Sequence, residues 1–415
     1  MTEPSPHAVI DGCRSCGRSD LAEFLDLGVT PLADGLVPED RLDQDEAVYP
    51  LTVVFCRSCT LVQIKETVPP QVLFGDEYPY YSSFSDALLE HSRKNVEALV
   101  DRLGLGEGSL AVELASNDGY LLQYFQKAGV DVLGIDPSPG PVAAAIERGV
   151  PTRREFFDLD VAKGLVAEGV RADVIVANNV LAHVPDQNSF VAGIAALLAD
   201  AGLVSVEVPY VVDLVDHGEF DTIYHEHQCY FSVESISRLF ERHGLTLVDI
   251  QHSSIHGGSL RAFFAHSGEP SAAVVAFLRA EIDRGAHEFS YYEGFAERVE
   301  GIKRDLIALL GDLKDQDKTI AAYGAAAKGA TMVNYTGVGT QYIDFVVDRN
   351  VHKQGRYMPG VRIPIVAPER LLDDRPDYVL ILAWNFAEEI VAQQAEYVAG
   401  GGHFIVPVPS PKVIT

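Results

Sequence analysis

The sequence predicts an α/β fold built on a doubly wound parallel sheet, with a small β-rich module before it and a second, smaller α/β unit after it. In the middle of the chain, apolar strand candidates alternate with helical stretches, at residues 110–114, 132–135, 173–177 and 203–208. Such alternation is typical of a parallel sheet whose connections are helices. The pattern returns beyond residue 318, with strand candidates at residues 319–323, 344–347, 378–383 and 403–406.

We expect three parts in the chain of 415 residues. Residues 1–75 mix cysteines and prolines with short apolar runs, which indicates a small β-rich module. Residues 76–267 begin with an amphipathic helical pattern and then hold the strands of the central sheet. Residues 268–415 begin with a helical bridge and end in the second α/β unit.

Composition limits the partners and the location of the protein. The chain has 32 basic and 60 acidic residues, a formal charge of -28, so its overall field repels nucleic acids. An anionic sugar nucleotide stays possible, because a few local donors and helix N-termini can hold a diphosphate. We expect no membrane partner, because no apolar run approaches the roughly 18 residues of a membrane helix. A cytoplasmic protein is expected, and its oligomeric state is not predicted.

Four of the five cysteines form two identical Cys-Arg-Ser-Cys pairs, at Cys13, Cys16, Cys56 and Cys59. Four thiolates are enough to close a tetrahedral zinc shell with no position left for water. The 39 residues between the pairs exceed the usual zinc-ribbon interval, but two hairpins can converge across such a loop. A structural zinc site is therefore predicted, with free or redox-active thiols as the alternative.

The first strand candidate of the central sheet ends in an acidic residue and leads into a tight turn and a helix. In this turn, Ala115 and Asn117 stand where a dinucleotide-binding loop would carry glycines. Asp136 ends the next strand, where a carboxylate can bind a ribose, and Asn178 ends a third strand at the same sheet edge. Alternatively, Asp136 and Asn178 only cap helices. The predicted cofactor residues are Glu113, Ala115, Asn117, Asp118, Gly119, Asp136 and Asn178.

Residues 220–232 carry two histidines, a glutamate and two tyrosines within seven positions. The His-x-His spacing does not suit a helical zinc site, and no third ligand is obvious. Acid–base chemistry fits better, because a neutral imidazole can accept a proton and a neighbouring glutamate can fix its tautomer. A tyrosine hydroxyl can also donate to a developing oxyanion. A solvated polar loop is the alternative.

A second strand, small-residue turn and helix arrangement occurs at residues 319–329. The N-terminus of that helix, together with Lys328, would suit a diphosphate group. A plain tight turn with a surface lysine is the alternative.

In this order, these segments resemble the sugar C-methyltransferases of deoxysugar biosynthesis, which methylate TDP-4-keto-sugars during antibiotic assembly. The resemblance extends over essentially the whole chain. It is carried by the Cys-Arg-Ser-Cys pairs and by residues 77–83, 113–119, 178–185, 224–232, 256–258, 323–328 and 383–385.

The resemblance implies an N-terminal zinc module, a central class I methyltransferase domain that binds S-adenosylmethionine, and a C-terminal Rossmann-like domain for the nucleotide-sugar. It implies His227 as the general base, with Tyr224 and His183 beside the reacting centre and Glu226 in support. It also implies substrate contacts from Tyr78, Tyr81, Tyr323, Lys328 and Asn385. The chain departs from the family pattern at His225 and Cys229, which puts the identity of the sugar in doubt.

The implied reaction removes a proton beside a 4-keto group and lets the enolate carbon attack the methyl group of S-adenosylmethionine. The expected target is C-3, with C-5 less favoured, of a sugar linked to TDP or another nucleotide. A 3-epimerase is one alternative, because the same enolate could be reprotonated. The other is a zinc-containing binding protein with an inactive methyltransferase domain.

Overall fold

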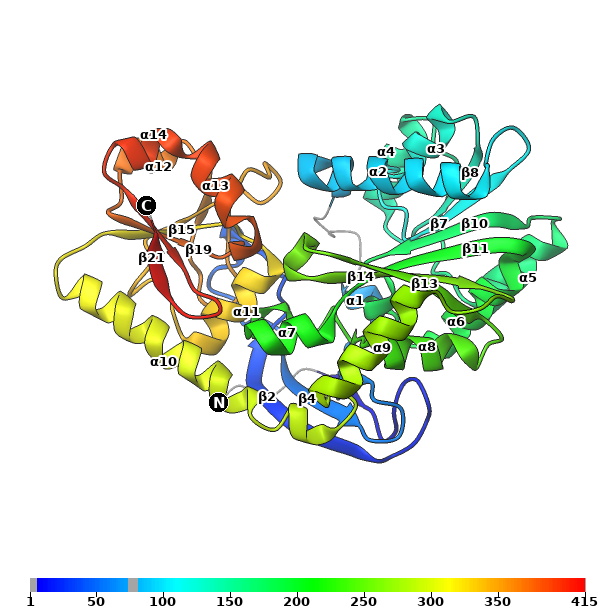
Figure 1. Ribbon diagram of the computed structural model, residues 1–415. Helices are drawn as coiled ribbons and strands as arrows, with labels where there is room; N and C mark the ends of the chain where they lie inside the picture. The colour runs from blue at the N-terminus through cyan, green and yellow to red at the C-terminus, as the bar shows by residue number, and fades with distance from the viewer. Residues whose placement is uncertain (1–5, 74–80, 415) are drawn as a thin grey trace.

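The computed structural model describes residues 6–73 and 81–414. Figure 1 shows the N-terminal strands in blue beneath the centre of the molecule, the central sheet in cyan and green to one side, and the C-terminal unit in orange and red opposite. Within the described residues, no helix combines the length and the apolar character that a membrane span requires.

The N-terminal module is a small antiparallel sheet completed by a strand from the middle of the chain. Its order is β12-β5-β4-β2, with bounds Cys229–Tyr230, Val62–Ile64, Val48–Cys56 and Leu21–Pro31. Short pairs flank it: β1 (Ala8–Val9) with β6 (Glu66–Thr67), and β3 (Val37–Pro38) with β17 (Arg356–Tyr357). Helix α1 (Pro70–Leu73) ends the described part of the module. The β12 and β17 pairings tie the module to both other parts of the chain.

The central sheet has seven strands in the order β13-β14-β11-β10-β7-β8-β9. Their bounds are Thr246–Ser253, Ser259–Ala265, Leu198–Pro209, Ala172–Asn178, Leu110–Leu114, Asp131–Ile135 and Thr152–Arg153. β11, β10, β7 and β8 are parallel, as predicted, and β9, which was not predicted, continues the parallel order, whereas β14 runs antiparallel to both β11 and β13. The sheet is therefore mixed, and residues 256–258 lie in the turn of its antiparallel hairpin.

Local sequence features explain where helix α2 begins and ends and why strand β10 is apolar. Ser85 caps α2 by accepting a hydrogen bond from Leu88 N–H, and Gly104 ends the helix in the left-handed region. The apolar run of β10 is buried on both faces, as strands between two helix layers require. The helices are α2 (Asp86–Leu103), α3 (Leu122–Lys127), α4 (Pro139–Glu147), α5 (Leu159–Ala167), α6 (Gln187–Leu197), α7 (Val211–His217) and α8 (Val233–Glu241).

The C-terminal unit follows a helical bridge of α9 (Ala272–Arg284) and α10 (Phe295–Lys314). Its sheet has the order β18-β16-β15-β19-β20-β21, parallel except for β21. The strands span Ile365–Val366, Val346–Val347, Ile320–Tyr323, Tyr378–Ile381, His403–Val406 and Lys412–Ile414. The helices are α11 (Ala327–Thr336), α12 (Arg370–Asp374), α13 (Ala387–Gln393) and α14 (Ala395–Ala399).

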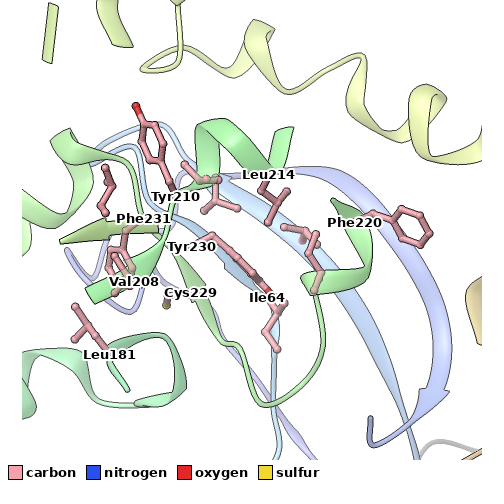
Figure 2. Packing of buried hydrophobic residues seen from close by; sticks show 14 of the residues in the cluster. Ile64, Leu181, Val208, Tyr210, Leu214, Phe220, Cys229, Tyr230 and Phe231 are labelled. Carbon is pink, nitrogen blue, oxygen red and sulfur yellow. The ribbon is translucent and has the colours of Figure 1, made fainter. Parts of the chain in front are cut away.

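A shared apolar core lies beneath residues 220–232. Figure 2 shows Tyr230 of β12 reaching toward Ile64 of β5, with Cys229 and Phe231 beside it and Val208 of β11 close by. All five side chains are fully buried. The predicted polar loop is therefore anchored on both the central sheet and the N-terminal module, which fixes its position.

Candidate active site

A cavity of about 700 Å³ lies where the three parts of the chain meet. The central domain supplies the turn after β7, the ends of β8 and β10, and the segment at residues 219–227. The C-terminal unit supplies residues 326–328, Lys353, Ala383, Asn385 and Phe386, and the N-terminal module supplies Asp34, Pro70 and Gln71. The cavity is therefore lined by both predicted nucleotide loops, after β7 and at residues 326–328, and by the predicted acid–base segment.

The turn after β7 adopts the backbone of a glycine-rich loop without its glycines. Ala115 and Asn117 have φ values of 57° and 48°, in the left-handed region that favours glycine. Both oxygens of Asp136 accept backbone hydrogen bonds, from Asn117 N–H at 2.9 Å and Ser138 N–H at 2.8 Å. Asp136 therefore orders the turn, and each carboxylate oxygen keeps a second lone pair for a ligand.

The seven predicted cofactor residues separate into two groups. Ala115, Asn117, Asp136 and Asn178 line the cavity, and Asn178 Oδ1 is buried with no hydrogen-bond partner among the described residues. Glu113, Asp118 and Gly119 do not line the cavity, and they contact the protein on the other side of the turn. Burial raises the pKa of Glu113, Arg148 pairs with Asp118 at 2.9 Å, and a Cβ on Gly119 would meet Val150 at 2.9 Å.

His227 is held in a defined orientation on the cavity wall. Its Nδ1 lies 3.0 Å from the Thr222 carbonyl oxygen, and its Nε2 lies 3.0 Å from the Tyr224 hydroxyl. A carbonyl oxygen only accepts, so Nδ1 carries the proton and Nε2 carries the ring's lone pair. Tyr224 O–H then donates to Nε2. This geometry leaves Nε2 as the atom that can act as a base.

The Thr222 carbonyl thus does what the sequence analysis assigned to Glu226. The described hydrogen bonds of the Glu226 side chain do not include His227, and Oε1 accepts from Asp34 N–H. Burial, followed by the charge of Asp34, raises the pKa of Glu226 to about 8. At neutral pH, this carboxyl group is therefore mainly protonated.

The other two histidines of the region occupy different environments. His183 follows β10 and lines the cavity, with its ring centroid 4.6 Å from that of His227. His225 points toward the N-terminal module, where Nε2 lies 2.9 Å from the Pro50 carbonyl oxygen, and it does not line the cavity. Burial lowers the pKa of each to about 4, so both are neutral at pH 7. Of these two, only His183 can face a ligand.

Lys328 lines the cavity, but its ammonium group already has partners within the protein and is less available to a diphosphate than predicted. Its ammonium group donates to Asn385 Oδ1 at 3.0 Å and lies 4.5 Å from the centre of the Trp384 ring. Burial lowers its pKa, and the charges of Asp221 and Glu219 oppose that effect. Part of its positive charge is therefore balanced within the protein.

Of the remaining predicted substrate residues, Tyr81 and Tyr323 do not line the cavity. Tyr81 stacks on His352, with ring centroids 5.7 Å apart, and Tyr323 is buried in the C-terminal core. Neither is among the lining residues, and Tyr78 lies outside the described residues. Asn385 does line the cavity, beside Lys328.

The polar groups of the site that the sequence did not predict include Asp34, Glu219, the Thr222 carbonyl and Lys353. A backbone carbonyl leaves no mark in a sequence. Asp34 sits in an ordinary turn, and Lys353 in a polar loop, and in neither place does the local pattern indicate a distant cavity.

The four paired cysteines converge at one point of the N-terminal module. Their Sγ atoms all lie within 4.8 Å of one another, with Cys13 and Cys59 at 3.5 Å and Cys16 and Cys56 at 3.6 Å. Zinc–thiolate bonds of about 2.3 Å give a tetrahedron with edges of about 3.8 Å. The donor set and its spacing therefore fit one structural zinc ion.

Comparisons with known proteins agree with this arrangement. Residues 254–409 match a family described as the C-methyltransferase C-terminal domain, residues 88–250 match a methyltransferase domain, and residues 13–74 match a zinc binding domain. The chain is 40% identical over 409 residues to C-methyltransferase NovU of Streptomyces niveus, covering 98% of this chain and 97% of that protein.

More distant similarities are limited to part of the chain. A ubiquinone biosynthesis O-methyltransferase of Methylobacterium is 27% identical over 161 residues, 34% of this chain and 61% of that protein. The crystal structure of magnesium protoporphyrin IX methyltransferase from Synechocystis with bound SAH has a TM-score of 0.35 and 18% identity, over 43% of this chain and 85% of that one.

The class of protein is therefore an S-adenosylmethionine-dependent methyltransferase. More narrowly, the chain belongs to the C-methyltransferase family that includes NovU. The cavity fits the methyl donor, because the Asp136 carboxylate and the unpartnered Asn178 oxygen lie at the carboxyl edge of the sheet, where open α/β folds bind ligands.

We expect Asp136→Asn to weaken S-adenosylmethionine binding by about 1 to 3 kcal/mol, because it removes a charge-assisted acceptor for a ribose. Calorimetric titration measures the affinity. Asp131→Asn is the matched control, since Asp131 lies exposed at the opposite end of β8. Equal affinity in wild type and Asp136→Asn would place the methyl donor elsewhere.

Proposed function

We propose that this enzyme methylates C-3, with C-5 as the less favoured position, of a TDP-4-keto-deoxysugar through an enolate formed by His227. The observation that carries the proposal is the pairing of His227 Nε2 with the Tyr224 hydroxyl on the wall of the cavity that also contains Asp136. The proposal includes the division at residues 75 and 267 into a zinc module, a methyl-donor domain and a nucleotide-sugar unit.

The chemistry of a carbon acceptor requires a base. A C–H bond beside a carbonyl group becomes nucleophilic only after its proton is removed, whereas S-adenosylmethionine supplies an electrophilic methyl group. His227 Nε2 carries the lone pair that takes this proton once the Tyr224 O–H turns from Nε2 to the substrate. The carbon's electron pair then attacks the methyl group, the methyl–sulfur bond breaks, and the sulfur keeps its electrons.

Negative charge that develops on the keto oxygen needs donors nearby. The Tyr224 O–H is the closest candidate, because it lies 3.0 Å from the base and its single proton can turn from Nε2 to the keto oxygen. The neutral imidazole of His183 is a second candidate on the same wall. Donors fixed before the reaction stabilise such an oxyanion without further reorganisation.

The C-terminal unit supports a nucleotide on the opposite side of the cavity. Asp348, after β16, accepts from Ala325 N–H at 2.8 Å and from Asn350 N–H at 2.8 Å. Asp136 holds Asn117 and Ser138 in the same way in the central domain. Two matching strand, turn and acid arrangements therefore occur, the first lining the cavity with Asn117 and Asp136 and the second reaching it with Ala326, which suits one nucleotide-like ligand at each.

The experiment is to screen TDP- and GDP-4-keto-deoxysugars with S-adenosylmethionine for a gain of one methyl group by mass spectrometry. We expect methylation of a TDP-linked 4-keto-sugar, at the carbon that exchanges deuterium in heavy water when the methyl donor is omitted. Exchange with inversion and no methyl transfer would instead identify a 3-epimerase. Neither exchange nor methylation of any of these sugars would refute the proposed substrate class.

A further inference from the structure

Asp34 belongs to the N-terminal module, yet it lies in the active-site cavity. It occupies the turn between β2 and β3, and its backbone N–H donates to Oε1 of Glu226 over 3.4 Å. Oε2 of Glu226 is buried and has no hydrogen-bond partner in residues 6–73 and 81–414. Buried polar atoms in folded proteins nearly always have a hydrogen-bond partner. The contact thus fixes one oxygen and leaves the other for a ligand.

Lys353 completes the cluster from the C-terminal unit. Its buried ammonium group donates to the Ala325 carbonyl oxygen at 2.7 Å, and the residue lines the cavity together with Asp34 and Glu226. The pairing of β3 with β17 brings the Lys353 segment beside the Asp34 turn. All three parts of the chain therefore meet at this cluster.

The charges of the cluster favour one arrangement of its proton. Burial raises the pKa of Asp34, and the positive charge of Lys353 opposes that rise. Burial and the charge of Asp34 together raise the pKa of Glu226 to about 8. The pKa values of both carboxyl groups are thus raised, and the positive charge of Lys353 favours ionisation of Asp34 over that of Glu226. Within the described residues, the titratable groups near Glu226 include His183, His225, His227, Tyr224 and Tyr230.

We propose that Asp34 is a positioning residue: its backbone N–H orients the Glu226 carboxyl group, and its carboxylate keeps that group a hydrogen-bond donor to an oxygen of the sugar. The inference rests on the proposed function, which supplies a substrate with carbonyl and hydroxyl oxygens. A neutral carboxylic acid can donate through its O–H, which a carboxylate cannot do. The zinc-binding module then takes part in the active site, in addition to supporting it.

The first test needs no substrate. Infrared difference spectra between wild type and Glu226→Gln isolate the protonated carboxyl band of Glu226, which we expect to titrate near pH 8. In Asp34→Asn, the band should titrate about one pH unit lower, because a nearby like charge has been removed. Asp43→Asn is the matched control, an exposed aspartate of the same module, and should leave the titration unchanged.

Lys353→Gln tests the cluster from the other side and keeps a donor for the Ala325 carbonyl. Removing the positive charge makes it harder for Asp34 and Glu226 to be ionised together, so the titration of the Glu226 band should move to higher pH. Opposite shifts in Asp34→Asn and Lys353→Gln are a result that general loosening of the fold does not produce. Thermal denaturation and zinc content establish that each variant is folded.

Activity provides the second readout. If the protonated Glu226 binds the sugar, the alkaline limb of kcat/KM should move to lower pH in Asp34→Asn by the same amount as the infrared band, and Asp34→Glu should restore it. An unchanged band and limb in Asp34→Asn would overturn the inference while methyl transfer stands. A shifted band in an enzyme that methylates no keto-sugar would overturn the proposed function instead.

Discussion

His227→Asn is expected to lower the rate of methyl transfer by about a hundredfold to ten-thousandfold, the usual effect of losing a general base. Asparagine can still donate to the Thr222 carbonyl, the partner of Nδ1, but it has no counterpart of Nε2. The orientation of the backbone is therefore kept while the base is removed. Mass-spectrometric turnover and deuterium exchange at the reacting carbon without methyl donor measure the two effects separately.

Both ligands should still bind to this variant, because Asp136 and Lys328 are unchanged. Tyr224→Phe should be milder, since it removes one donor and leaves Nε2 able to take the proton. His266→Asn, at an exposed position just beyond β14, is the matched histidine control. Deuterium exchange at the wild-type rate in His227→Asn would make His183 the next candidate, because His225 does not line the cavity.

Most of the fold follows from the sequence because buried parallel strands leave a clear pattern. The predicted strand at residues 110–114 coincides with β7, and the strand predicted at residues 203–208 lies within β11. The antiparallel pair β13 and β14 was not predicted, and strand direction depends on pairing with β11, which local sequence does not encode. Strand β12, only two residues long, exists because β5 pairs with it.

The candidate site was predictable where chemistry is concentrated in one segment. Residues 224–227 stand out because so many titratable groups in succession are unusual in a core. The contact of Asp34 with Glu226 joins residues 192 positions apart, and only the folded chain creates it. The same holds for the Thr222 carbonyl, whose role depends on a backbone turn rather than on its side chain.

The second large effect is expected at the cysteine cluster, where Cys13→Ser should abolish binding of the one zinc ion expected per chain. Structural zinc contributes on the order of 10 kcal/mol to the folding of small domains, and the N-terminal sheet is small. Loss of the ion should therefore unfold the module. Metal analysis and thermal denaturation measure these changes, and Cys229→Ala, at the fifth cysteine, should keep its zinc.

Loss of zinc should also disturb the active site, although no cysteine of the cluster lines the cavity. Strand β5 of the module pairs with β12, and Ile64 N–H donates to the Gln228 carbonyl at 3.0 Å, one residue after His227. When β5 unfolds, the segment that carries His227 and Glu226 loses this support. We therefore expect Cys13→Ser to lose methyl transfer together with zinc, while S-adenosylmethionine binding by the central domain declines less. A metal-free enzyme that is folded and fully active would refute the zinc assignment and this coupling together.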